Sequence, residues 1–552
     1  MSNGWRRFKI LLAMVLVVAA IVVMTRTLWD RPPTVVGDSL WQMQTDAIEN
    51  EVADWGHWGV NPDDYSTTTN HSNRLVPVYS FGITLDAFTG ENSIYRDLLR
   101  LSELYGQPPE QSFDPAAEYM DQTDIYHLQK MAIEQGKKYI VLVIFDGLDW
   151  ETTRIAAIYR NRAVTYSEGP GNGLAYQDYD QTVTDFGWMV TSPSHRKAKT
   201  DVNAQLITSL DEECTGGYSS QLGGYTPWST PASYPYLLGD DRNIPHVVTD
   251  SAASATSMTC GAKTYNGAIN VDPEGQPLMP IARELQEQGF AIGAVTSVPF
   301  SHATPACAYA NNVSRSDYQD LARDMLGLPS AFNRTPLPGM DVVIGCGWGE
   351  TVPEESIKSV IASQGENFSP ANQYFCRNDL AKIDSAHGGR YQVALRDDSR
   401  VGSEVLAEAT AEAIRHNRRL FGFFGTSEGH LPYATANGDY QPTSGISRTE
   451  EYSEEEKTAN PTLRHMTESA LAVLERNENG FWLMIEAGDV DWANHQNNVD
   501  DSIGAVFSGE AAFQAVCEWA ENNDCWDQTA VILTGDHGHL FVIDRPEAFV
   551  PD

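Results

Sequence analysis

Two side chains late in the chain are spaced so that both could bind one metal ion. Asp491 and His495 lie four positions apart in a stretch expected to be helical, and positions i and i+4 share one face of a helix. A carboxylate and an imidazole are common zinc ligands, at about 2.0–2.2 Å from the ion. Glu486 ends the preceding apolar run, where its carboxylate is free to bind a second ion. This spacing predicts a metal centre.

A serine occupies a chemically useful position in residues 247–272, VVTDSAASATSMTCGAKTYNGAINVD. Val247 and Val248 are expected to end a buried strand, Asp250 and Ser251 form the turn, and a helix opens near Ser251. Free N–H groups and the positive end of the helix dipole favour an anion there. By itself the pattern is more typical of a serine that only caps an alanine-rich helix.

Two further apolar runs end in acidic residues. Residues 139–145 (YIVLVIF) end at Asp146, and residues 530–534 lead into T-G-D-H-G-H, which contains Asp536 and His537. Ligands of open α/β sheets bind beyond the carboxyl ends of the strands, so these side chains are well placed for a metal. A single D-G dipeptide after a strand would indicate only a turn.

Together these motifs resemble those of the alkaline phosphatases. D-S-A-A-S-A-T followed by C-G-A-K-T is similar to the nucleophile segment of that family, and E-x4-D-x3-H and T-x-D-H-x-H match its metal motifs. The resemblance covers residues 139–539 in the family's order. It implies hydrolysis of phosphate monoesters through a phosphoserine at Ser251, at a site with two zinc ions and one magnesium ion.

The resemblance also implies a set of ligands for each ion. These sets are Asp146, Asp536 and His537 for one zinc, Asp491, His495 and a third residue for the other, and Asp146, Glu486 and Thr304 for magnesium. His539 matches a family histidine that orients a neighbouring ligand without binding metal.

Arg315 stands eleven residues after Thr304, the spacing of the family's arginine that clamps two phosphate oxygens. Two positions depart from the family pattern. At position 302 bacterial members often carry aspartate, whereas this chain carries histidine, as animal members do. Trp492 follows the zinc aspartate at a position where other members carry lysine or histidine. The identity of the third metal is therefore open.

The third ligand of the second zinc is expected from the other end of the chain. In the family it is a histidine beyond the D-H-x-H motif, yet only His539 follows His537. Residues 70–82 and 121–127 resemble, in order, the strand and helix that close the family's chain. We therefore expect a circular permutation, with His71 as the ligand and its strand beside residues 530–534. The alternative is a polar loop histidine.

The elements that must hold these side chains indicate an α/β fold. A continuous apolar run is typical of a parallel strand buried on both faces, as at 139–145, and further strands are expected at 291–297, 341–345, 420–425, 481–485 and 530–534. We expect one large domain with a doubly wound, mostly parallel central sheet and helices on both faces. Residues 29–138 would complete the core, and residues 139–552 would form the catalytic core with loop excursions at 151–240 and 428–460.

The charge and cysteine content limit the classes of partner and metal site that the protein can have. There are 75 acidic and 37 basic residues, for a net charge of −38, which argues against nucleic acid as a partner. Phosphate esters would need local positive charge from metal ions. Seven cysteines without a C-x-x-C motif argue against a cysteine-rich zinc site, although Cys346–Cys376 or Cys517–Cys525 could pair.

The first residues carry a targeting signal. Arg6, Arg7 and Lys9 precede an apolar run at 10–24, so residues 1–28 are predicted to be a signal-anchor or a signal peptide. We expect the protein to be exported to the periplasmic or extracellular face and tethered to the membrane. A homodimer is a further expectation.

Three alternatives remain for the function. A phosphodiesterase of the same superfamily tends to carry threonine as nucleophile and to lack the arginine clamp. A sulfatase needs C/S-x-P-x-R, and residues 191–195 (TSPSH) lack the arginine. The last alternative is a catalytically inactive anion-binding protein of the cell surface.

Overall fold

The computed structural model describes residues 38–66, 71–106, 111–210, 216–239, 246–441 and 450–551. The apolar run at 10–24, predicted as a signal-anchor, lies outside these residues. Within them, no helix combines the length and the apolar character needed to cross a membrane.

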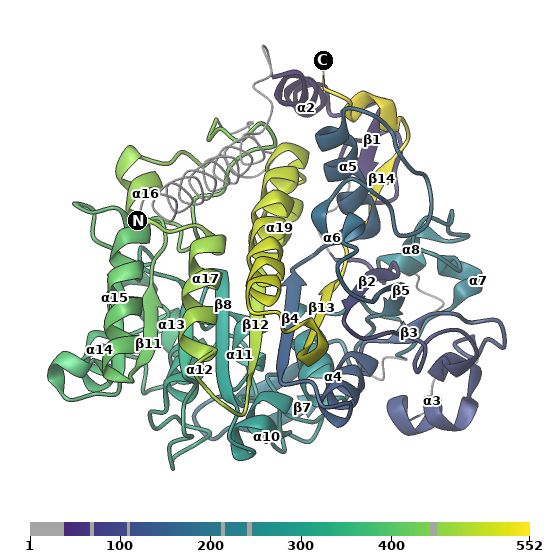
Figure 1. The fold of residues 1–552 in the computed structure, drawn as a ribbon. Helices are drawn as coiled ribbons and strands as arrows, with labels where there is room; N and C mark the ends of the chain where they lie inside the picture. Colours follow the sequence, from purple (N-terminus) through teal and green to yellow (C-terminus); the bar gives the residue numbers. More distant parts are fainter. Residues whose placement is uncertain are drawn as a thin grey trace, which may run out of the picture.

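Ten strands form the central sheet, in the order β10-β11-β9-β8-β12-β4-β13-β2-β5-β3 (Figure 1). In that order they span Tyr391–Leu395, Arg419–Phe423, Val342–Cys346, Ala291–Pro299, Phe481–Ala487, Tyr139–Phe145, Thr529–Gly535, Val76–Phe81, Thr184–Val190 and Met120–Asp121. Every neighbouring pair is parallel except those made by β2, which runs antiparallel to both β13 and β5. The predicted mostly parallel α/β sheet is confirmed.

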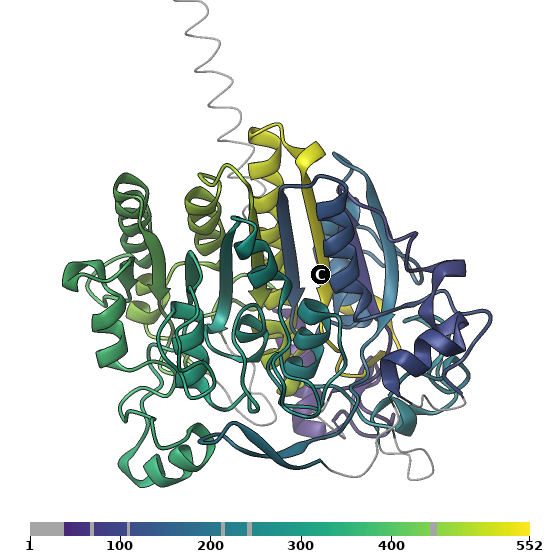
Figure 2. The same cartoon turned by 90° about the horizontal axis from the view of Figure 1, so that it is seen from below.

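Helices cover both faces of the sheet because successive side chains of a buried strand point to opposite sides. In β4, Val141 and Val143 belong to one apolar core, whereas Leu142 and Ile144 belong to the other. The first core is closed by α5 (Trp150–Asn161), α15 (Gly402–His416), α17 (Leu463–Leu474) and α19 (Val499–Asn522). The second is closed by α4 (Asp124–Glu134), α9 (Ser251–Cys260), α10 (Ile281–Glu287) and α12 (Tyr318–Leu326). Figure 1 shows α17 and α19 in front of the sheet, and Figure 2 gives the view from below.

The N-terminal segment belongs to the same domain. Strand β2 pairs with β13, with Phe81 opposite Val531, as predicted from the sequence. Helix α2 (Ser39–Asn50) packs on α19, where the Gln44 side chain accepts the Val499 N–H at 2.6 Å. Strand β1 (Gly56–Trp58) pairs with β14 (Phe541–Ile543) near the other end of the chain. The first and last described segments therefore lie side by side.

Two expected loop regions contain regular structure. Residues 151–240 include most of α5, strand β5 and a hairpin of β6 (Ala198–Asp201) and β7 (Leu206–Leu210). Strand β5 is only partly buried, so it lacks the continuous apolar run that marks the central strands. The acidic run in 428–460 begins a short helix, α16 (Glu454–Ala459), because Ser453 caps it in a capping box.

The described cysteines are all free thiols, so neither disulfide considered from the sequence is formed. Cys346, Cys376, Cys517 and Cys525 are buried. They pack as small apolar side chains.

Candidate active site

Ser251 is the first residue of α9, and its side chain is buried. The capping role belongs to Asp250, whose carboxylate accepts the Ala253 N–H at 3.0 Å. The Ser251 hydroxyl instead lies 3.5 Å from Asp146 Oδ1 and 3.4 Å from His537 Nε2. The serine therefore faces two predicted metal ligands at the positive end of a helix.

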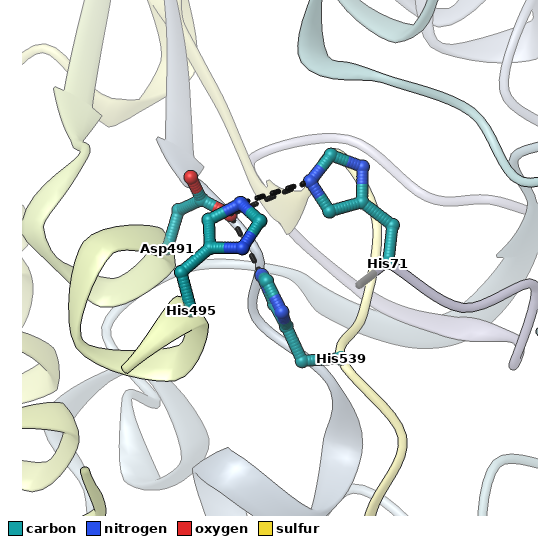
Figure 3. Close-up of side chains that lie close together, drawn as sticks. All are labelled: His71, Asp491, His495 and His539. Carbon is teal, nitrogen blue, oxygen red and sulfur yellow. Dashed lines mark hydrogen bonds and ion pairs between the residues drawn. The ribbon is translucent and has the colours of Figure 1, made fainter. Parts of the chain in front are cut away.

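Four side chains gather beside it, as Figure 3 shows: His71, Asp491, His495 and His539. Asp491 and His495 come from α18 (Asp489–His495), His71 precedes β2, and His539 follows β13. Asp491 Oδ1 lies 3.4 Å from His495 Nε2 and 3.9 Å from His71 Nε2. The Nε2 atoms of His71 and His495 are 3.2 Å apart. Three segments far apart in the sequence thus meet at one group of possible metal ligands.

Two backbone contacts hold His71 in this group. The Ser72 N–H donates to the Gly538 carbonyl at 2.7 Å, which joins the start of β2 to the loop after β13. The Nδ1 atom of His71 lies 2.7 Å from the Thr249 carbonyl. Because a carbonyl only accepts, this contact assigns the proton to Nδ1 and leaves the Nε2 lone pair facing Asp491.

His539 makes a different contact. Its Nε2 lies 2.7 Å from Asp491 Oδ1, the shortest distance that Asp491 makes to any of these histidines. A hydrogen bond of this kind orients a carboxylate toward an ion. The geometry matches the orienting role that the resemblance implies.

Asp146, Asp491 and His537 form a second possible ligand group. His537 Nε2 lies 3.3 Å from Asp146 Oδ1 and 3.8 Å from Asp491 Oδ1. Asp536, predicted to bind the same zinc, lies outside this group, although its Oδ2 is 3.5 Å from His537 Nε2. Its Oδ1 accepts the Gly147 N–H at 2.9 Å. Asp491 thus belongs to both ligand groups.

Two of the predicted magnesium ligands, Glu486 and Thr304, lie close together. Glu486, in β12, is buried and accepts a hydrogen bond from Thr296. Burial raises the pKa of Glu486 to about 8, and the hydroxyls of Thr296 and Thr304 oppose this only in part. Thr304 lies in α11 (Ala303–Cys307).

The charges of the site fit divalent cations. The carboxyl groups of Asp146, Glu486, Asp491 and Asp536 are buried, and no lysine or arginine in the described segments forms an ion pair with them. Burial raises the pKa of Asp146 well above its usual range, and it raises that of Asp536 to about 6. Burial also lowers the pKa of His71 to about 3, so this imidazole is neutral at pH 7, as a metal ligand must be. Uncompensated buried carboxylates are costly unless a cation joins them.

Arg315 is held close to Ser251 by an ion pair with Asp250. Its Nη1 lies 3.0 Å from Asp250 Oδ2, and Asp250 directly precedes Ser251. The sequence pattern indicates only a turn at Asp250 and does not reveal this contact with Arg315. The guanidinium is thereby held near the N-terminus of α9.

A sequence profile of the alkaline phosphatase family matches residues 233–548, more than half of the chain. The chain belongs to the alkaline phosphatase family. The matched range contains Ser251, Arg315, Glu486 and the metal-site residues of α18 and of the loop after β13. His71 and Asp146 precede it.

Individual family members cover part of the chain. The repressible alkaline phosphatase of Saccharomyces cerevisiae is 30% identical over 306 residues, 54% of this chain and 46% of that protein. The alkaline phosphatase of Escherichia coli is 29% identical over 328 residues, 57% and 63% of the two chains. The chain thus spans roughly half to two thirds of these relatives. Among solved structures, Thermus thermophilus alkaline phosphatase is 21% identical, covers 74% of this chain and 62% of that one, and gives a TM-score of 0.43.

The two departures from the alkaline phosphatase pattern are neighbours. The rings of His302 and Trp492 lie 6.4 Å apart in an edge-to-face arrangement. Burial lowers the pKa of His302 to about 3. A neutral imidazole and an indole therefore lie side by side next to the metal-site residue Asp491.

Proposed function

We propose that this protein is an exported, metal-dependent phosphomonoesterase that works through a phosphoserine at Ser251. The observation that carries the proposal is the position of the Ser251 hydroxyl, within 3.5 Å of Asp146 and His537 at the N-terminus of α9. Export rests on the basic and apolar pattern of residues 6–24. A membrane anchor and a homodimer remain predictions.

The proposed ligand sets are Asp146, Asp536 and His537 for one zinc, His71, Asp491 and His495 for the other, and Asp146, Thr304 and Glu486 for magnesium. When bound, such ions supply positive charge that lowers the pKa of the serine hydroxyl, neutralises the phosphate and leaving-group oxygens, and activates water. His539 would orient Asp491, and Thr249 would hold the tautomer of His71.

The protein's own groups account for the course of the reaction. Arg315 and the free N–H groups of α9 hold the phosphate oxygens, and Asp250 limits the movement of the guanidinium. Ser251 Oγ attacks phosphorus and loses its proton, while the P–O bond to the alcohol breaks and the alcohol leaves protonated. Water then attacks the phosphoserine, which releases phosphate and restores the hydroxyl. Phosphoryl transfer needs positioning and charge stabilisation more than further covalent groups.

We also propose that the chain is a circular permutant of the usual alkaline phosphatase order. The order of residues 70–82 and 121–127, the pairing of β2 with β13 and the approach of His71 to Asp491 support this. The test is a chain that starts at Lys138, runs to residue 551 and continues through a short linker into residues 38–136. The end of the described chain lies next to α2, so a short linker suffices (Figure 1). We expect this chain to fold and keep its activity, and loss of both would contradict the permutation.

The function is tested by comparing an aryl phosphate with its diester and with the aryl sulfate. We expect the zinc- and magnesium-loaded protein to hydrolyse the monoester far faster than the other two. Preference for the diester or the sulfate would support the corresponding alternative enzyme. Binding of phosphate without any turnover would support the inactive anion-binding protein.

A further inference from the structure

A buried glutamine from the N-terminal segment connects the nucleophile helix to a metal-binding loop. Gln122 lies between β3 and α4 and has no exposed surface. Its Nε2 donates to Ser254 Oγ and, at 3.0 Å, to the Asp536 carbonyl. Ser254, three residues after Ser251 in α9, also donates to the Asp536 carbonyl, at 2.8 Å. Three groups from three segments form one closed set of hydrogen bonds.

This set fixes the part of the backbone that carries two proposed metal ligands. The Asp536 carbonyl belongs to the peptide unit between Asp536 and His537, so two donors to it restrict the rotation of that unit. Both donors are buried, which makes the loss of either one costly. The orientation of His537 toward Ser251 therefore depends on Gln122 and Ser254.

We propose that Gln122 is a positioning residue for phosphoryl transfer, which sets the distance between the Ser251 nucleophile and the Asp536–His537 metal loop. The inference rests on the proposed function and adds a residue that contacts neither the substrate nor a metal-binding atom. An amide suits the task because its NH₂ group offers two donors, one for the hydroxyl and one for the carbonyl. Methionine has a similar length and no donor.

Other contacts between the same segment and α9 do not reach the metal loop. Gln129, on α4, donates to the Met258 carbonyl at 3.0 Å in the second half of α9. Asp121 pairs with Lys263 at 3.0 Å, just beyond the end of that helix. Both residues attach the helix to the segment, whereas Gln122 alone among these three also contacts Asp536. Gln129 is therefore a matched control, being a buried glutamine on the same segment with a bond to the same helix.

The experiment compares Gln122→Met, Ser254→Ala, their double mutant and Gln129→Met, each loaded with metal. Ser254→Ala is the safer variant for folding, because alanine favours a helix interior. We expect Gln122→Met and Ser254→Ala to lower kcat/KM for an aryl phosphate at least tenfold, with the inhibition constant of inorganic phosphate changed less than threefold. The double mutant should lose less than the product of the two effects, because both residues act on one carbonyl. Gln129→Met should keep kcat/KM within twofold at a similar cost in thermal stability.

Cobalt substitution gives a second measurement that is independent of turnover. The visible absorption bands of bound Co²⁺ should shift in Gln122→Met and Ser254→Ala and remain unchanged in Gln129→Met. An active wild type combined with variants that match Gln129→Met in both rate and cobalt spectrum would overturn the positioning role alone. The wild type could lack monoesterase activity while the cobalt spectra of Gln122→Met and Ser254→Ala still differ from its own. That result would support the positioning of the loop and overturn the proposed function.

Discussion

His71 and Thr249 are joined by a 2.7 Å contact between the imidazole Nδ1 and the backbone carbonyl, although 178 positions separate them in the chain. Thr249 lies two residues before Ser251, so this contact links a proposed zinc ligand directly to the nucleophile segment. The remaining ring nitrogen of His71 faces Asp491 and His495. The N-terminal segment therefore takes part in the site as well as in the sheet.

Replacing His71 by alanine should remove one ligand of a zinc ion. Changes to the surroundings of metal ligands typically cost about 10–100-fold in affinity or activity, and we expect at least that for this ligand. Zinc content by atomic emission and aryl phosphate hydrolysis provide the measurements. His127→Ala, an exposed histidine of α4, is the control. Full zinc binding by His71→Ala would exclude His71 as a ligand.

Arg315→Ala should weaken phosphate binding while the fold is retained. A charge-assisted pair of this kind contributes about 1.5–3 kcal/mol, which corresponds to roughly 10–150-fold in the inhibition constant of inorganic phosphate. Arg464→Ala is the matched control, since Arg464 is comparably exposed and also pairs with acidic side chains. Equal phosphate inhibition in both variants would place Arg315 outside the binding site.

After metal removal, the free energy of unfolding should fall as the pH rises from 6.5 to 8. Burial raises the folded-state pKa of Glu486 to about 8, above its usual value of 4.5. In this window the folded, metal-free protein keeps a proton that the unfolded chain has released, so its free energy of unfolding falls as pH rises. The fall attributable to Glu486 is on the order of 2 kcal/mol across the window.

The measurement is urea denaturation of chelator-treated protein at pH 6.5 and pH 8. Glu486→Gln should show a smaller fall, and restored zinc and magnesium should abolish it because the cations keep the carboxylates ionised. Metal-free protein whose stability is level or rises over this range would contradict the account.

The central strands were predictable because their sequences are buried on both faces. The apolar run at 139–145 coincides with β4, and the run at 530–534 lies within β13. Strand β5 was not predicted, since one of its faces is partly exposed and it contains Asp185 and Gly187. Helix α19 was not predicted either, because it is buried on most sides and lacks a polar stripe.

The site residues that belong to short sequence motifs were predictable from the sequence. Asp491 and His495 share one helix, and His71 approaches them as expected. The contacts of Asp250 with Arg315 and of Gln122 with Asp536 were not predictable, because they depend on how distant segments pack. A glutamine or a turn aspartate has no spacing pattern that reveals such a partner.

The most direct test of the proposed mechanism is to identify the phosphorylated residue. Metal-loaded protein is mixed with an aryl phosphate, quenched in acid and digested, and the peptides are analysed by mass spectrometry, alongside Ser251→Ala. We predict one phosphoryl group on Ser251 in the wild type, none in Ser251→Ala, and a loss of turnover by orders of magnitude in a variant that keeps its metal and fold. Turnover of more than a few per cent in Ser251→Ala, or a phosphoryl group on another residue, would contradict the account.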